Sequence, residues 1–80
     1  MYCVYLIRSK TNPEKTYIGF TSDLEQRLQS HNHGNSFHTA DFRPWHLVAY
    51  FAFDSKVKAI EFETYLKSGS GNAFAKKRFW

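Results

Sequence analysis

The pattern of hydrophobic and polar positions predicts three β-strands. Residues 2–9 and 16–20 are short runs rich in aromatic and β-branched side chains, and residues 46–53 form a longer apolar run. Such runs are typical of strands when turn residues bound them. Residues 10–15 contain Asn-Pro and several charges, so the first two strands are predicted to form an antiparallel hairpin. Because the third run is apolar throughout, we expect it to be the central strand.

A first helix is predicted directly after the hairpin. Ser22 followed by Glu25 matches a capping box, and Gly34 stands where a helix of this length would end. Residues 35–45 show no periodicity and contain Pro44, so they are predicted to be a loop.

Two further helices are predicted after the third strand. Asp54 or Ser55 would cap a helix over residues 56–67. Ser-Gly-Ser-Gly at residues 68–71 would break it, and Asn72 would cap a short helix over residues 73–80. The order is therefore β-β-α-β-α-α, and we predict an α+β fold with a small three-stranded sheet flanked by helices. Residues 1–80 are expected to form a single domain.

Composition and charge favour an anionic partner. The chain has 11 Lys and Arg against 7 Asp and Glu, and the basic excess lies mainly after residue 50. This distribution points to nucleic acid before other partners. The only cysteine, Cys3, fits a reducing cytosol and a buried position, so we expect a cytoplasmic protein. No signal peptide and no membrane-spanning run is evident.

Polar residues lie beside the apolar stripe of the first predicted helix. On a helical projection, Leu24 and Leu28 define the stripe, His31 falls next to Leu24, and Arg27 falls at the edge beside His31. Arg27 and His31 are four residues apart, so they are neighbours at the rim of the core. Both are candidates for a cleft. Alternatively, Arg27 extends its apolar stem along the core, and His31 is a helix-end histidine with satisfied hydrogen bonds.

A carboxylate lies on the apolar face of the second predicted helix. That face is defined by Ala59, Ile60, Phe62 and Leu66. On the same kind of projection, Glu63 falls inside the face, next to Ala59, whereas Glu61 falls on the opposite side, in solvent. A carboxylate in the position of Glu63 requires a cation or hydrogen bonds. Its partner is either a basic side chain or a divalent metal ion.

The hairpin pairs two tyrosines beside a glycine. Tyr17 and Gly19 share one face of the second strand, and Tyr5 can lie across the hairpin on that face. Gly19 leaves a gap in which a backbone or a ligand can approach closely. A simple aromatic pair would explain the two rings but not the glycine.

A basic segment near the end of the chain is a weaker candidate for phosphate binding. Gly69 and Gly71 precede a predicted helix start and can offer backbone N–H groups to an anion. Positive side chains surround them: Lys67, Lys76, Lys77 and Arg78.

In their order and spacing, these residues resemble the GIY-YIG nuclease family over nearly the whole chain. Cys-Val-Tyr at 3–5 stands where the family has Gly-Ile-Tyr, and Tyr-Ile-Gly at 17–19 is intact. The remaining matches are Arg27, ten residues after Tyr17, then His31, then Glu63 at the position of the family's metal-binding glutamate, and Asn72. The chain looks most like the small stand-alone bacterial members, which are related to the N-terminal domain of the excision-repair nuclease subunit.

The resemblance implies metal-dependent cleavage of DNA, and a role in DNA repair. It implies that Glu63 holds one Mg²⁺ or Mn²⁺ ion and that Arg27 binds the phosphate. Either Tyr5 or Tyr17 would help to remove the proton of the attacking water, with its pKa lowered by nearby positive charge, and His31 would orient the water or relay the proton. The expected DNA contacts are Gly19, Lys67, Ser68, Gly69, Asn72, Lys76 and Lys77.

The chain departs from the family pattern in two places. Cys3 replaces the first glycine of the motif, a structural position where little effect is expected. Phe20 stands where some relatives have lysine, so one phosphate contact is missing. The 80 residues include no separate DNA-binding domain.

Two alternatives to a nuclease remain open. The same scaffold can serve as a DNA-binding module that cuts nothing, although such a module has no need of Glu63. A histidine metal site is the other alternative, with His31, His33, His38 and His46 as ligands, but their spacing matches no closed zinc site.

The substrate is expected to be single-stranded or structured DNA, because so small a domain covers only a short stretch of nucleic acid. Aromatic residues can provide stacking platforms for unpaired bases: Phe37, Phe42, Trp45, Phe79 and Trp80.

Overall fold

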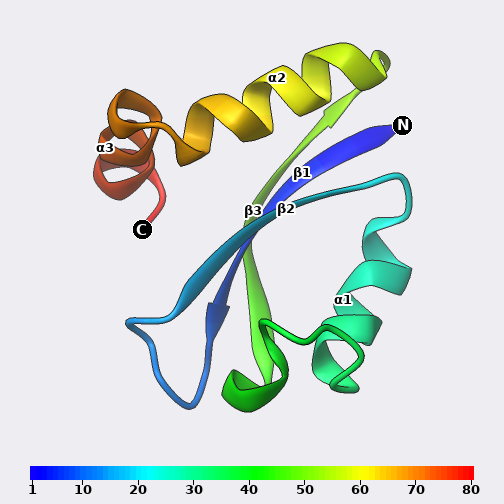
Figure 1. The fold of residues 1–80 in the computed structure, drawn as a ribbon, viewed down its shortest axis with the longest axis vertical. Coiled ribbons are helices and arrows are strands. Elements are labelled where there is room, and N and C mark those ends of the chain that lie inside the picture. Colours follow the sequence, from blue (N-terminus) through cyan, green and yellow to red (C-terminus); the bar gives the residue numbers. More distant parts are fainter.

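The computed structural model describes all residues, 1–80, and contains a three-stranded antiparallel sheet. The strands are β1 (Tyr2–Ser9), β2 (Thr16–Thr21) and β3 (Trp45–Phe53), in the order β2-β1-β3 (Figure 1). The predicted α+β class and element order are confirmed.

The prediction that β3 is central was wrong. The central strand is β1, whose residues 3–7 are all buried, whereas β3 alternates between partly buried and exposed positions along an edge.

The sheet is covered by helices on both faces. Helix α1 (Leu24–Asn32) packs on one face, and α2 (Lys56–Lys67) and α3 (Gly69–Arg78) pack on the other (Figure 1). A single-turn 3₁₀ helix, η1 (Ala40–Phe42), interrupts the predicted loop before β3. Alternation along β1 explains the two layers, because successive side chains point to opposite faces.

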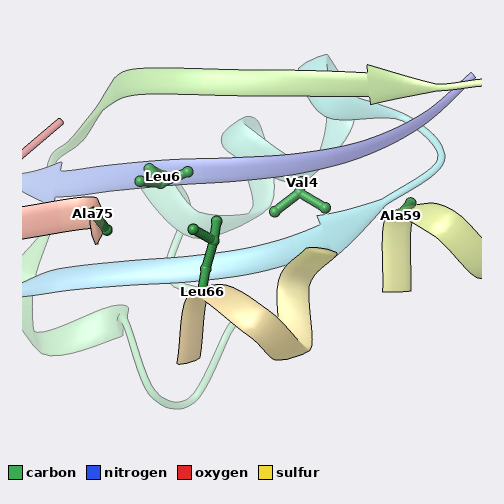
Figure 2. Packing of buried hydrophobic residues seen from close by; sticks show 5 residues of the cluster. All are labelled: Val4, Leu6, Ala59, Leu66 and Ala75. Carbon is green, nitrogen blue, oxygen red and sulfur yellow. The ribbon is translucent and has the colours of Figure 1, made fainter. Parts of the chain in front are cut away.

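The two faces of β1 carry separate hydrophobic cores. Val4 and Leu6 point toward the helices α2 and α3, where they meet Leu66, Ala59 and Ala75 (Figure 2). The other face carries Tyr5 and Ile7, packed with Trp45 and with the leucines of α1. The two tyrosines of the hairpin therefore face α1.

The start of α1 differs from the predicted capping box. Asp23 is the N-cap, and its carboxylate accepts a hydrogen bond from the backbone N–H of Gln26 at 3.1 Å. The hydroxyl of Thr21, the last residue of β2, accepts a hydrogen bond from the N–H of Asp23 at 3.0 Å. This contact fixes the turn so that Asp23, rather than Ser22, reaches the capping position.

Helix α3 begins four residues earlier than predicted, and Ser68 rather than Asn72 caps it. The Ser-Gly-Ser-Gly segment is thus mostly helical instead of a break. Gly71 explains this, because a Cβ there would overlap the backbone carbonyl of Tyr65 at the end of α2. A residue without a side chain permits the close approach of the two helices. The apolar face of α2 is also narrower than predicted. Ile60 was assigned to it, but this side chain is 41% exposed.

We predict that Gly71→Ala destabilises the protein by about 1–3 kcal/mol, because the methyl group forces α2 and α3 apart. Urea denaturation measures this change. Gly69→Ala is the matched control: a Cβ at Gly69 meets nothing within 4 Å, so that variant should gain about 0.5 kcal/mol. Equal stability of the two variants would contradict the packing argument.

Candidate active site

Gly19 is the position at which the ring of Tyr5 crosses the neighbouring strand. The two residues are direct partners in the β1–β2 pair. A Cβ on residue 19 would overlap the hydroxyl oxygen and the adjacent ring carbons of Tyr5. The gap predicted beside Tyr17 is therefore filled by the second tyrosine of the hairpin, and the phenol of Tyr5 is carried over β2 toward helix α1.

The Tyr5 hydroxyl contacts two side chains of α1. Its oxygen lies 2.8 Å from Nε2 of His31 and accepts a hydrogen bond from Nε of Arg27 at 3.2 Å. Tyr5 is 0% exposed. The predicted neighbours Arg27 and His31 thus meet at one phenol, which ties the first helix to the hairpin.

His31 is also completely buried, and Thr39 contacts its other ring nitrogen. Nδ1 of His31 lies 2.7 Å from the hydroxyl of Thr39. Because the ring has no contact with solvent, His31 is not placed to orient an attacking water, which corrects one of the two roles implied by the resemblance. Sequence analysis did not identify Thr39, which lies in a segment without periodicity, and no motif marks it.

Burial sets the charge states of this inner pair. Loss of solvation lowers the pKa of His31 to about 4, and the positive charge of Arg27 acts in the same direction. Burial also raises the pKa of Tyr5, and this outweighs the opposite effect of Arg27. Both groups are therefore neutral near pH 7. For Tyr5, Arg27 lowers the phenol pKa as expected, but burial has the larger effect and the net pKa is raised.

Tyr17 forms an outer layer over these residues. Its ring centroid lies 5.1 Å from that of His31 and 6.3 Å from that of Tyr5, and its side chain is partly exposed. Hydrogen bonding to Tyr5 is the main cause that raises the pKa of Arg27, and Tyr17 adds to the same effect. Arg27 is therefore hydrogen-bonded to one phenol and influenced electrostatically by the other.

Glu63 is half-buried, as the helix pattern predicts. Its side chain is 21% exposed, compared with 63% for Glu61. Lys67 lies one turn later and places its ammonium group 3.2 Å from the Glu63 carboxylate. The negative charge of Glu63 is close enough to Tyr5 to contribute to the raised pKa of the phenol. The carboxylate of α2 thus acts electrostatically on the same phenol that holds Arg27.

The arrangement of acidic, histidine and cysteine side chains limits how a metal ion could be held. No group of three or more His, Cys, Asp or Glu side chains lies together, so the alternative histidine site is contradicted. A single carboxylate that already attracts the Lys67 ammonium suits Mg²⁺ or Mn²⁺, since Mg²⁺ is commonly held by one or two carboxylates together with water and substrate phosphates. Glu63 is the residue that would hold such an ion.

The predicted DNA-contacting residues of α2 and α3 lie at the surface. They are exposed: Lys67, Ser68, Gly69, Asn72, Lys76 and Lys77. The predicted pair of free backbone donors is reduced to one, because the N–H of the buried Gly71 is donated to the hydroxyl of Ser68 at 3.3 Å. Gly19 is buried beneath Tyr5 and offers no side chain to DNA.

A cavity of about 280 Å³ joins the hairpin to α2 and α3. Its lining includes Tyr17, Lys67 and Asn72, together with Trp80. The cavity therefore brings Lys67 and Asn72 beside the strand that carries Tyr17, whereas Lys76 and Lys77 lie in the last turn of α3 and do not line it.

Comparison with known proteins gives one family. The model of the GIY-YIG catalytic domain matches residues 1–78. Among curated proteins, the structure-specific endonuclease subunit SLX1 of Scheffersomyces stipitis is 44% identical over 69 residues, covering 78% of this chain. The protein of the same name from Malassezia globosa is 40% identical over 67 residues, covering 79% of this chain. The aligned regions make up 20% and 15% of those relatives, so the chain corresponds to a small part of each.

A solved structure is similar as well. The solution NMR structure of the UPF0213 protein BH0048 from Bacillus halodurans has 30% sequence identity and a TM-score of 0.55, covering 96% of this chain and 84% of that chain. None of the helices is long and apolar enough to cross a membrane.

We predict that His31 makes stability depend on pH. Its pKa is about 4 in the folded protein and near 6.5 when exposed, so the unfolded chain binds the proton more readily between these values. Stability should be fully present above pH 6.5 and should fall by about 2–3 kcal/mol as the pH drops to about 4.

Urea denaturation across this pH range tests the assignment. His31→Gln does not titrate and should lack this part of the fall, whereas His33→Gln, at an exposed histidine, should keep it. The same pH slope in His31→Gln and in the parent would contradict the burial argument.

Proposed function

The chain belongs to the GIY-YIG family, and on this premise we propose that it is an endonuclease that hydrolyses phosphodiester bonds in DNA with the help of one divalent metal ion. The observation that carries the proposal is the group formed by Arg27, the two phenols and Glu63. A guanidinium held at its Nε atom by a buried phenol, together with a half-buried carboxylate that acts electrostatically on the same phenol, is an arrangement suited to a phosphate and its metal ion. The role in DNA repair, the cytoplasmic location and the assignment to the stand-alone bacterial type stay predictions.

Arg27 is proposed to bind the scissile phosphate. Its Nε–H is donated to Tyr5, which leaves the N–H groups of its two terminal nitrogens for the non-bridging oxygens. Because the helix and the hairpin both hold this side chain, little rotamer freedom is lost when the phosphate binds.

The two phenols are proposed to have different roles. The hydroxyl of Tyr5 is buried and satisfied by Arg27 and His31, so Tyr5 acts by positioning Arg27. Tyr17 is partly exposed beside Arg27. Tyr17 is therefore the phenol that can contact the attacking water and take part in removing its proton.

Glu63 is proposed to hold Mg²⁺ or Mn²⁺. When bound, the ion would stabilise negative charge on the phosphate and on the leaving oxygen. Lys67 neutralises the carboxylate in the structure at 3.2 Å. Its long side chain is half-exposed and can turn toward a DNA phosphate once a metal ion replaces it.

Structured or single-stranded DNA is the proposed substrate. The relatives that match are named as subunits of structure-specific endonucleases. The longest extent of the domain is 30 Å, which spans about nine base pairs. A contact surface this short favours recognition of shape over recognition of a long sequence.

The exposure of the aromatic side chains reduces the number of candidate stacking platforms. Trp45 is only 5% exposed and belongs to the core, and Phe42 and Phe79 pack against the two hydrophobic clusters. Phe37 is 91% exposed in the loop between α1 and η1. A ring this free of contacts with the protein core is available to stack on an unpaired base.

We predict that Glu63→Gln abolishes cleavage and leaves the fold intact, because the amide fits the same space but cannot neutralise a divalent ion. Single-stranded, duplex and branched DNA should be incubated with Mg²⁺, with Mn²⁺ and with chelator. Glu61→Gln, at the exposed acid of the same helix, is the control and should cut at the parent rate. DNA binding without metal-dependent cutting on any substrate would instead favour a non-catalytic module.

We predict that Phe37→Ala weakens binding to single-stranded DNA by about 1–3 kcal/mol and has less effect on duplex DNA. Fluorescence anisotropy with labelled oligonucleotides measures both affinities. Phe37→Trp should keep the binding, since it keeps a stacking surface. An unchanged affinity for single strands in Phe37→Ala would exclude this residue as a platform.

A further inference from the structure

A buried chain of hydrogen bonds leads from loop residues 33–39 to Arg27. The hydroxyl of Thr39 lies 3.5 Å from the backbone carbonyl of Ser36 and 2.7 Å from Nδ1 of His31. Nε2 of His31 contacts the Tyr5 hydroxyl, which accepts from Nε of Arg27. Each of these groups can donate a fixed number of protons, so the donor in one hydrogen bond determines the donor in the next.

The Arg27 end fixes the direction at Tyr5. Arg27 Nε always carries hydrogen, so the Tyr5 oxygen must be the acceptor of that bond. A neutral Tyr5 then has one proton left to donate, and its only other hydrogen-bonding partner is Nε2 of His31. His31 must therefore have its lone pair on Nε2 and its proton on Nδ1.

The Thr39 end agrees with this direction. A proton on Nδ1 of His31 needs an acceptor, and the Thr39 oxygen supplies one at 2.7 Å. The hydroxyl proton of Thr39 is then directed to the carbonyl of Ser36. Every donor in the buried chain is satisfied.

The opposite tautomer leaves a buried proton without a partner. If Nε2 of His31 carried the proton, the Tyr5 oxygen would accept from both His31 and Arg27. The hydroxyl proton of Tyr5, on a side chain that is 0% exposed, would then have no acceptor and would lie against Arg27. Unpaired buried donors are costly, so this arrangement is disfavoured.

We propose that Thr39 is a positioning residue, which holds His31 in the Nδ1–H tautomer so that the lone pairs of Tyr5 face Arg27 and keep its guanidinium aimed at the phosphate. The role of Arg27 in this statement rests on the proposed function. The tautomer and the bond from Arg27 to Tyr5 do not, because they are properties of the protein without DNA.

The tautomer can be measured directly. In ¹⁵N-resolved NMR spectra near pH 7, we expect Nδ1 of His31 to carry the proton and Nε2 to carry none. In Thr39→Val, which keeps the shape of the side chain but removes the acceptor, each tautomer of His31 leaves one buried donor unpaired. We therefore expect the proton to be shared between Nδ1 and Nε2 and the Nε–H of Arg27 to exchange faster with water. A proton on Nε2 in the parent protein would overturn the proposal, and this result does not depend on the folding of any variant.

Cleavage assays test the consequence for the site. Thr39→Val should lower the cleavage rate by about 10- to 100-fold, and Thr39→Ser, which restores the hydroxyl, should recover most of it. Thr64→Val, at an exposed threonine of α2, should cut like the parent. The backbone of Thr39 stays anchored in all variants, because its carbonyl accepts from Nε1 of Trp45 at 2.8 Å.

The two proposals can fail separately. A protein that cuts no DNA but shows the expected tautomer and the Thr39→Val shift would refute the nuclease function and leave the positioning of Arg27 intact. A folded Thr39→Val variant with the parental tautomer and the parental cleavage rate would refute the role of Thr39 and leave the nuclease intact.

Discussion

The hydroxyl of Tyr5 is the point on which the candidate site depends. It receives the guanidinium of Arg27 on one side and contacts His31 on the other, inside a space closed to solvent. This one oxygen therefore connects the central strand to α1 and fixes the side chain best suited to hold a phosphate. Its position depends in turn on a glycine in the adjacent strand, since any larger residue would occupy the same space.

The site has two layers with different physical characters. The inner layer consists of His31 and Tyr5, which are closed to solvent. Burial keeps both groups uncharged. The outer layer contains the charges, Arg27 and Glu63, which come from opposite faces of the sheet. The proposed division of labour follows from this arrangement: the inner groups hold the geometry, and the outer groups meet the charges of the substrate.

Sequence patterns predicted the strands and α2 closely, and they singled out the residues of α1 and α2 from which the candidate site is built. They failed where distant contacts decide the outcome. The central strand was misidentified because an edge strand that packs against helices can be as apolar in sequence as a central one. The start of α3 was misplaced because the contact of Gly71 with the end of α2 cannot be inferred locally. Thr39 was missed because its partner is set by the fold.

The packing of the Tyr5 ring over Gly19 also constrains which amino-acid substitutions these two positions accept. A methyl group at residue 19 is incompatible with a tyrosine at residue 5, and a smaller side chain at residue 5 releases Arg27 from its anchor. Replacing Gly19 disturbs the packing, and replacing Tyr5 removes the hydroxyl that holds Arg27. The two positions should therefore change together, because the glycine leaves room for the ring whose hydroxyl holds Arg27.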